Sequence, residues 1–355
     1  MPTPEPVQPV QPVHAAQPVH AAQPVLRATS LSKTFTIGSA GRGRRHVKAV
    51  RDVSLAVHAG ESLGIVGESG CGKTTLARML VGLERPDNGT IEIGGHDVTR
   101  LSGRERRALT RDVQMVFQDP YTSLDPRMSV LDLVAEPLRV HRRHRGAGAV
   151  RERVAELLQL VNLSPDMMSR YPHQFSGGQR QRIGIARAIA LEPKVLVCDE
   201  PVSALDVSVQ AQVVNLLRDL QQRLGIAVVF IAHDLGVIRH ISDNTAVMYL
   251  GSAVETAATA DLFAQPTHPY SQALLSASPT IDRERSARRA QRIVLQGDPP
   301  SPLDPPPGCS FHTRCRFATA VCSVDAPPPV DVGAGHVAVC HHTEQTVPLA
   351  ASVAE

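Results

Sequence analysis

Aromatic residues are scarce in this sequence of 355 residues: tryptophan is absent, and phenylalanine and tyrosine together supply 3% of the chain. Proteins that bind single-stranded nucleic acids stack bases on aromatic side chains within a strongly basic surface. The low aromatic content and a net charge of only +3 therefore argue against a dedicated nucleic-acid binder. Long apolar runs are missing too, since stretches such as 226–232 fall far short of the roughly 20 residues of a membrane-spanning helix. If the protein serves a membrane, other chains must span it.

Cysteine is not distributed as in a disulfide-stapled protein. Of six cysteines, four crowd into residues 309–340, while Cys71 and Cys198 stand alone in Gly-rich or apolar surroundings. This clustering indicates a local site rather than a framework of disulfides. The N-terminus, rich in Pro, Gln, Val and Ala, has no basic region followed by an apolar core, so it is not a secretory signal. We predict a disordered tail over 1–25 and a second tail over 343–355.

The rest of the chain alternates strand-like and helix-like segments. Residues 26–100 contain short apolar runs between Gly-containing turns, which predicts strands around a first helix. Apolar side chains recur at helical spacing over 154–161 and 209–224. The β-branched runs 195–198 and 226–231 are too short for helices and predict buried parallel strands. We therefore expect an α/β sheet protein, followed after the Pro-rich segment at 298–308 by a C-terminal appendage.

Residues 67–74 read GESGCGKT and fit the pattern G-x-x-x-x-G-K-[ST], between an apolar run and a helix-compatible run. In such a loop the glycines let backbone N–H groups close around phosphate oxygens. Lys73 is expected to contact the β- and γ-phosphates, and the Thr74 hydroxyl to bind Mg²⁺. A Gly-rich turn without this function would rarely combine the pattern with this context. The sequence thus predicts a nucleotide site made of Gly67, Glu68, Ser69, Gly70, Cys71, Gly72, Lys73, Thr74 and Thr75.

A phosphate-binding loop of this kind needs an acidic partner for its metal. Residues 195–200 supply one, because an apolar strand ends there in Asp199 and Glu200. Asp199 is predicted to hold Mg²⁺, directly or through water. Glu200, one residue on, is expected to point to the other side of the chain and to activate the attacking water as general base. Taken alone, an Asp-Glu pair after a strand is more often a solvated strand end.

The segment 175–190, FSGGQRQRIGIARAIA, resembles the signature of ATP-binding cassette (ABC) ATPases. Phe175 stands where the family usually has leucine, which keeps an apolar anchor. The resemblance implies a P-loop NTPase fold over 26–258, with a RecA-like parallel sheet, an antiparallel β subdomain and a helical subdomain inserted at about 119–178. It also implies a second anion site at a helix N-terminus. The implied site acts in trans, on the nucleotide of a partner ATPase. It consists of Ser176, Gly177, Gly178 and Gln179.

Other elements of ABC ATPases follow in the family's order, although each is weak by itself. The resemblance implies that Gln118 is the Q-loop glutamine, which senses Mg²⁺ and water and links to the membrane subunits, so that Mg²⁺ is held by Thr74, Gln118 and Asp199. Asp206 resembles the D-loop aspartate. His233 resembles the switch histidine that contacts the γ-phosphate, whereas a lone histidine after a strand is usually a capped or core residue. Phe35 resembles the aromatic that stacks on adenine, although a core phenylalanine is nearly as common.

Four stretches, 66–75, 83–91, 115–138 and 266–279, resemble the ATPases of bacterial dipeptide and oligopeptide (peptide/nickel) importers. The last contains His268-Pro269-Tyr270, found in the C-terminal extension of that family, here 259–342. Alone, the triplet would be a helix-start turn. The resemblance implies an ATP-hydrolysing subunit that energises peptide import from the cytoplasmic face of the cell membrane, with nickel or another small solute as the alternative cargo. Its implied partners are two membrane-spanning permease subunits, a second ABC ATPase (a sister subunit or an identical chain) and an extracytoplasmic solute-binding protein, with no nucleic acid.

The four C-terminal cysteines are spaced C-x5-C-x6-C-x17-C. Thiolates that converge from a short segment suit an iron–sulfur cluster or zinc, and the spacing favours neither. Resemblance to peptide-importer ATPases with this tail implies a 4Fe-4S cluster, with zinc as the alternative. A disulfide is disfavoured in a cytoplasmic ATPase. The predicted ligands are Cys309, Cys315, Cys322 and Cys340, with His336, His341 and His342 as nearby substitutes.

Two further interpretations stay open. Basic runs at 42–48, 139–145 and 283–292 are typical of solvated faces, and contact with acidic permease loops or lipid headgroups is the alternative. The competing class of protein is a soluble ABC ATPase that acts on nucleic acid or ribosomes. The single cassette and the lack of an aromatic-rich basic surface argue against it.

Overall fold

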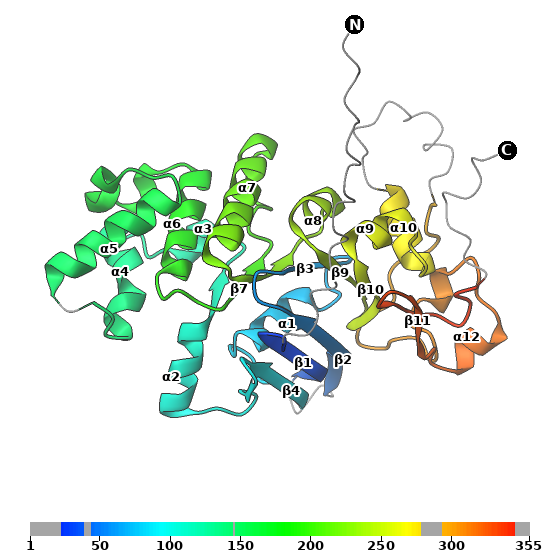
Figure 1. The fold of residues 1–355 in the computed structure, drawn as a ribbon. Helices are drawn as coiled ribbons and strands as arrows, with labels where there is room; N and C mark the ends of the chain where they lie inside the picture. The colour runs from blue at the N-terminus through cyan, green and yellow to red at the C-terminus, as the bar shows by residue number, and fades with distance from the viewer. Residues whose placement is uncertain (1–22, 39–43, 145, 278–292, 345–355) are drawn as a thin grey trace, which may run out of the picture.

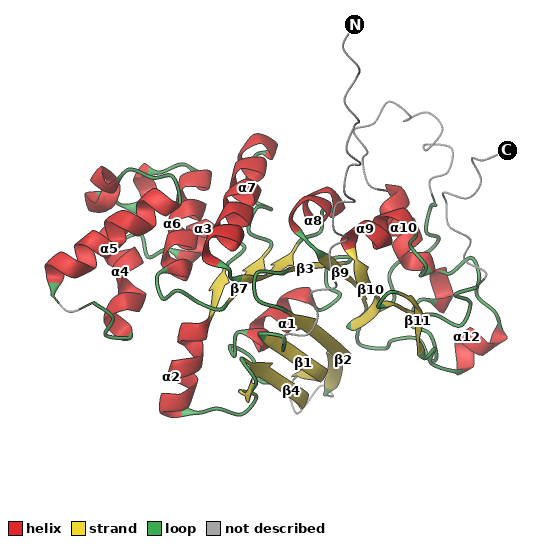
Figure 2. Cartoon of the chain, viewed as in Figure 1, coloured by secondary structure: helices red, strands yellow, loops and turns green. Residues whose placement is uncertain are grey.

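The computed structural model describes residues 23–38, 44–144, 146–277 and 293–344. Predictions made for residues 1–22, for the basic run 283–292 and for the tail from 345 onward fall on segments outside these ranges. Two sheets and the helices around them make up the described chain (Figures 1 and 2).

The central sheet has eight strands in the order β11-β12-β10-β9-β3-β8-β7-β6. The neighbours from β9 to β6 are parallel, whereas β10, β12 and β11 continue the sheet in antiparallel fashion. The buried strands predicted at 195–198 and 226–231 are confirmed as β7 and β8. The strands are β3 (Ser62–Val66), β6 (Val113–Val116), β7 (Val195–Asp199), β8 (Ala227–Ile231), β9 (Asn244–Tyr249), β10 (Ser252–Ala258), β11 (Pro329–Gly333) and β12 (His336–Val339).

A smaller antiparallel sheet has the order β2-β1-β4-β5. It lies below the central sheet in Figure 1, and helix α1 (Lys73–Leu80) contacts both β2 and the central strands β7 and β8. The prediction of a β-rich segment over 26–100 is confirmed. Its strands are β1 (Leu26–Ile37), β2 (Arg45–Val57), β4 (Asn88–Ile93) and β5 (His96–Asp97).

The central sheet is covered on both faces, and the side chains of its strands alternate between two cores. In β7, Val195 and Val197 pack with α1 and the small sheet, whereas Leu196 and Cys198 pack with the helices opposite. Successive side chains of a strand point to opposite faces. Burial on both faces explains why this strand reads as one continuous apolar run in the sequence.

Helices supply all the regular structure that is described between β6 and β7, and they gather at the β6 end of the central sheet (Figure 1). The helical spacings found at 154–161 and 209–224 lie largely in α5 and α7, as predicted. Within the described ranges, no helix combines the length and apolarity that crossing a membrane demands. The other elements are α2 (Gly103–Asp112), α3 (Pro120–Ser123), α4 (Val130–Val140), α5 (Ala147–Leu160), η1 (Pro165–Ser169), η2 (Pro172–Gln174), α6 (Gly177–Ile189), α7 (Val207–Leu224), α8 (Leu235–Ile241), α9 (Thr259–Ala264), α10 (Pro269–Ala277), η3 (His312–Arg314) and α12 (Ala320–Val324).

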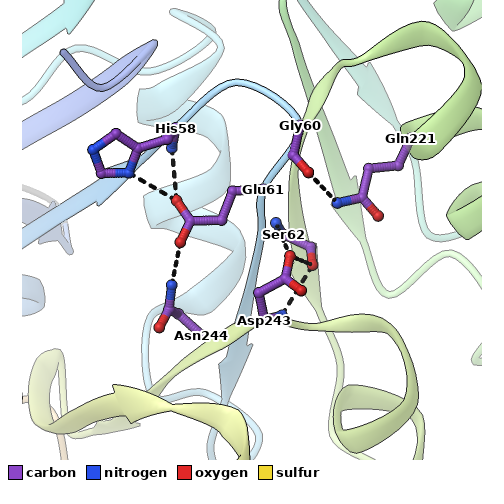
Figure 3. A network of polar contacts seen from close by, with 7 residues as sticks. All are labelled: His58, Gly60, Glu61, Ser62, Gln221, Asp243 and Asn244. Atoms are coloured by element: carbon purple, nitrogen blue, oxygen red, sulfur yellow. Dashed lines mark hydrogen bonds and ion pairs between the residues drawn. The ribbon is translucent and has the colours of Figure 1, made fainter. Parts of the chain in front are cut away.

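Polar contacts fix the start of β3 against β9, as Figure 3 shows. The Glu61 carboxylate accepts hydrogen bonds from His58 N, at 2.8 Å, and from the Asn244 side chain. Ser62 donates to Asp243 Oδ2 from both N and Oγ, at 2.8 and 2.7 Å, and Asp243 N donates back to Ser62 O at 3.0 Å. These contacts hold β3 in register with β9. They thereby fix the position at which β3 ends and the loop 67–72 begins.

The C-terminal hairpin joins the central sheet instead of forming a separate appendage, because β12 pairs with the outer edge of β10. The His336 ring lies 2.7 Å from Glu255 Oε1, and Glu255 is 1% exposed. His336, named from the sequence as a substitute metal ligand, is therefore engaged by a carboxylate of β10. The edge of β10 can accept a further strand because an open sheet edge has unpaired backbone groups. A strand as short as β12 has too little sequence pattern for this pairing to be predicted. The boundaries proposed for the extension stay a prediction.

Candidate nucleotide site

Residues 67–72 form the loop that connects β3 to α1. Gly67 has a φ of +154°, and a Cβ there would lie 2.2 Å from the carbonyl oxygen of Met248. Gly72 has a φ of +103°, and a Cβ there would lie 2.1 Å from the carbonyl oxygen of Ala49. Neither position can carry a side chain without moving backbone. Close packing against β9 and β2 thus requires glycine at both ends of the loop.

Lys73, the first residue of α1, is 5% exposed. Its ammonium group donates to the carbonyl oxygens of Gly67, at 2.8 Å, and Glu68, at 3.1 Å. The charge is thereby held within the loop, next to the N–H groups at the start of the helix. A cation and free N–H groups at a helix N-terminus form an anion site.

Asp199 ends β7 beside the start of α1. Its Oδ1 accepts a hydrogen bond from the Thr74 hydroxyl at 3.2 Å. Burial raises the pKa of Asp199, and the Thr74 hydrogen bond opposes this shift. A carboxylate and a hydroxyl in contact are hard oxygen ligands of the kind that Mg²⁺ prefers.

Glu200 lies in the left-handed region, with a φ of +45°, which is strained for a residue other than glycine. Its N–H donates to Ile231 O at 3.0 Å, which holds this turn against the end of β8. Its Oε2 accepts a hydrogen bond from the Gln118 amide at 2.9 Å and lies 3.9 Å from His233 Nδ1. The structure therefore brings together the three residues that the sequence predicted to be catalytic.

Gln118 and Glu200 border an open cavity of about 390 Å³, whereas His233 and Asp199 are not among the residues that line it. Pro302, in the Pro-rich segment of the extension, lines it as well and was not foreseen from the sequence, nor were Val47 and Ala49. No local pattern identifies these three, since only the fold brings them to the loop. The predicted residues that line the cavity are Phe35, Ser69, Gly70, Gly72, Lys73, Thr74, Thr75, Gln118 and Glu200.

The signature segment lies apart from this cavity, at the start of α6. Ser176 caps the helix: its hydroxyl accepts from Gln179 N at 3.3 Å, and Gln179 Oε1 accepts from Ser176 N at 3.1 Å. A Cβ at Gly178 would lie 2.4 Å from a methyl group of Val209 in α7. Asp206, predicted for the D-loop, is the N-cap residue of that helix. The signature and D-loop segments are thus packed together, and none of the four predicted signature residues borders the cavity that Lys73 lines.

All six cysteines lie in the described ranges and are free thiols. Burial raises the pKa of Cys315 to about 11, with further contributions from Cys340, Cys309 and Cys322. Two contacts bring the segments of these cysteines together: Cys309 N donates to Cys322 O at 2.9 Å, and His342 lies 3.5 Å from Cys322 Sγ through its ring and 3.4 Å from Cys340 Sγ through its N–H. Within the ranges that the structure describes, however, no three His, Cys, Asp or Glu side chains form a group that could hold one metal ion.

The nucleotide site and fold together define a class of protein. Residues 50–203 match the family described as "ABC transporter", and residues 254–322 match "Oligopeptide/dipeptide transporter, C-terminal region". The chain belongs to the ABC transporter ATP-binding proteins of the oligopeptide/dipeptide group and is an ABC-type ATPase. Both the family and the P-loop α/β fold predicted from the sequence are confirmed.

Three relatives with named transport functions are similar to this chain over most of its length. The chain is 48% identical to the oligopeptide transport ATP-binding protein OppF of Haemophilus influenzae, over 83% of this chain and 88% of that protein. It is 50% identical to OppF of Escherichia coli, over 79% and 84% of the two chains. With the di/tripeptide transport ATP-binding protein DppF of Pseudomonas aeruginosa it shares 49% identity, over 86% and 93%.

Solved structures agree with this assignment. The fold matches a dimeric ATP-binding cassette in a post-hydrolysis state, bound to ADP and Pi, with a TM-score of 0.59 and 29% identity, over 66% of this chain and 98% of that one. It also matches cbiO1 of Clostridium perfringens, part of an ABC transporter complex, with a TM-score of 0.62 and 25% identity, over 77% and 100%.

Proposed function

We propose that this protein is the ATP-hydrolysing subunit of a membrane importer for dipeptides or oligopeptides. The observation that carries the proposal is the union, in one chain, of the nucleotide site with an extension that matches the oligopeptide/dipeptide transporter C-terminal region. Relatives at about half identity over most of the chain are named for oligopeptide or di/tripeptide transport. Two permease subunits, a second ATPase and a solute-binding protein complete the assembly, at the cytoplasmic face of the membrane.

In the proposed mechanism the phosphate-binding loop holds the nucleotide, and Phe35 stacks on the adenine. Thr74 and Asp199, already in contact, would hold Mg²⁺ together with Gln118, and the bound ion would supply positive charge beside the phosphate oxygens. Glu200 takes the proton of the attacking water, and His233 contacts the γ-phosphate. The bond from Gln118 to Glu200 orients the base, because an amide fixed on one carboxylate oxygen leaves the other free.

Two ATPase chains are proposed to face each other head to tail. Ser176 and its glycines lie outside the cavity of their own chain, yet they present a hydroxyl and helix N-terminal N–H groups. We propose that this site contacts a nucleotide that another chain presents. Each nucleotide is then held between Lys73 of one chain and the signature of the next.

The permease subunits are proposed to dock in a groove of about 580 Å³ between the core and the helical segment. Leu83, Phe117 and Val140 line it and are 55%, 40% and 57% exposed. Exposed apolar side chains grouped in a groove are typical of protein contacts. Phe117 precedes Gln118, so movement of a docked permease can reach the Glu200 side chain through one residue.

The importer function is tested with the chain co-expressed with the permease subunits and the binding protein and reconstituted in vesicles. We expect the detergent-solubilised permeases to carry the ATPase through purification, and labelled di- to pentapeptides to accumulate only with ATP and the binding protein. Accumulation of nickel in place of peptides would favour the alternative cargo. An ATPase that stays with ribosomes or nucleic acid and never follows the permeases would refute the importer function.

We further propose a 4Fe-4S cluster held by Cys309, Cys315, Cys322 and Cys340. A single zinc ion at about 2.3 Å from each sulfur needs a compact ligand group, and the described residues contain no such group. We propose iron and sulfide in place of zinc because the four-cysteine tail resembles that of peptide-importer ATPases with a 4Fe-4S cluster. Bound there, a cluster would cross-link the segment 309–322 to the end of β12 and could exchange electrons.

The cluster is tested on protein purified without oxygen. We expect broad visible absorption and about four irons per chain, both lost in Cys315→Ser. Cys198→Ala, at a buried strand position far from the four-cysteine segment in sequence, is the matched control and should keep the colour. A colourless wild-type protein with one zinc or no metal would overturn the cluster and leave the ATPase untouched.

A further inference from the structure

Tyr270 and Arg314 of the C-terminal extension both contact Glu68 of the phosphate-binding loop. The backbone N–H of Glu68 donates to the Tyr270 hydroxyl at 2.9 Å. The Glu68 carboxylate is paired with Arg314, whose Nη1 lies 3.1 and 3.0 Å from its two oxygens. Both partners lie more than two hundred residues further along the chain.

Tyr270 is placed by its neighbours in the His-Pro-Tyr triplet and by the core. Its side chain is fully buried, and its ring lies 4.7 Å from that of Tyr249 and 5.4 Å from that of Phe311. Its N–H donates to His268 Nδ1 at 3.1 Å, and His268 N donates to Glu255 at 2.9 Å. Burial lowers the pKa of His268 to about 4, so the ring is neutral and can accept this bond at neutral pH. The triplet is thus more than a helix-start turn: it aims a hydroxyl at the loop.

Arg314 is placed by the short segment between two of the clustered cysteines. It ends η3, directly before Cys315, and its side chain is only 8% exposed. Ser310 of the same segment accepts a hydrogen bond from Arg51 of β2 at 2.8 Å. The guanidinium also lies over the Tyr249 ring, 6.0 Å from its centroid. A buried, always charged side chain needs a partner, and Glu68 supplies the negative charge.

Glu68 connects these contacts to the lysine of the site. Its carbonyl oxygen accepts from Lys73 Nζ at 3.1 Å and from Cys71 N at 3.3 Å. Every polar group of the residue is therefore engaged: the N–H by the extension, the carbonyl by the loop and the carboxylate by the extension again. Fixing this residue fixes the path of the loop from Gly67 to Lys73.

We propose that Tyr270 and Arg314 are positioning residues of the ATPase, which clamp Glu68 and so hold the phosphate-binding loop in the shape that nucleotide requires. Neither residue touches the nucleotide in this role. A loop that is ordered before binding avoids the entropic cost of ordering on binding. The clamp depends neither on the peptide cargo nor on the cluster proposed above.

The test measures the dissociation constant of a fluorescent ATP analogue with Mg²⁺, on the full chain. We expect Arg314→Met to weaken binding about 5-fold, the lower end of coupling between sites. Arg314→Lys should restore most of it, because a single nitrogen contacts both carboxylate oxygens. Arg316→Met is the matched control: Arg316 flanks Cys315 on the other side and bonds to Gln272 instead, so its loss should leave binding unchanged.

A double-mutant cycle separates a clamp from a general structural role. We expect Glu68→Gln to weaken binding by a similar factor, and Arg314→Met to add little in that background, because the pair is already broken. In the assembled transporter the same variants should raise the KM for ATP while kcat stays within about 2-fold, since binding is weakened equally in the ground state and in the transition state. Additive losses, or unchanged binding in Glu68→Gln and in a folded Arg314→Met, would overturn the proposal. If Arg314→Met fails to fold, Glu68→Gln and Tyr270→Phe decide it.

Discussion

Replacing Glu200 with Gln is expected to lower ATP turnover by at least about 100-fold, the lower end of what a general base contributes. The amide keeps the shape of the side chain and can still contact Gln118, which lies 2.9 Å from the carboxylate in the native chain. Binding should therefore persist, because the phosphate-binding loop and Lys73 are untouched. ATP that binds without being hydrolysed should trap two ATPase chains in the closed pair.

Turnover is measured as phosphate release from the assembled transporter, and closure as ATP-dependent dimerisation of the ATPase chains. Glu192→Gln is the matched control, because Glu192 lies on the surface, pairs with Arg153 and does not line the cavity. Near-normal turnover in Glu200→Gln would remove Glu200 from the role of base. The strained backbone at this residue, with its φ of +45°, would then lack a catalytic explanation.

The phosphate-binding loop could be found from the sequence because all its determinants are local. A strand, a loop with glycines at fixed positions and a helix follow one another within about twenty residues, and the backbone rules for glycine and helix N-termini decide the rest. Asp199 and Glu200 were found for a similar reason, since parallel strands bring their carboxyl ends to one edge of the sheet. In each case a short apolar run in the sequence marks a strand, and the site residues follow this run directly.

Contacts made across the fold could not be found in this way. Tyr270 and Arg314 contact the loop, and Pro302 borders the same cavity, although all three lie more than two hundred residues from Glu68 in the sequence. Arg314 was not identified from the sequence, because nothing in its neighbourhood indicates burial. The left-handed backbone of Glu200 was also missed, because it follows from the packing of two strand ends against each other.

Replacing Ser176 with Arg is expected to abolish hydrolysis at the partner chain's loop and to leave this chain's own nucleotide binding nearly intact. The hydroxyl caps α6 and does not border the cavity of its own chain, so an arginine there obstructs only what approaches from outside. Loss of one preorganised donor to a developing charge costs about 100-fold or more in rate, and the bulk of arginine adds steric exclusion. The cost to folding is limited to a helix cap, about 1 kcal/mol.

The nucleotide trapped on each of the two ATPase chains is measured separately. Vanadate traps the nucleotide in the assembled transporter, and an azido-ATP then photolabels the chain that holds it. We expect Ser176→Arg to remove the label from the partner ATPase and to keep it on the chain that carries the substitution. Ser164→Arg is the matched control, because Ser164 is also an exposed N-cap serine of the helical segment, at the start of η1, and has no place in the signature. If the label is lost from the substituted chain itself, the signature acts on its own nucleotide, and the head-to-tail pair is wrong.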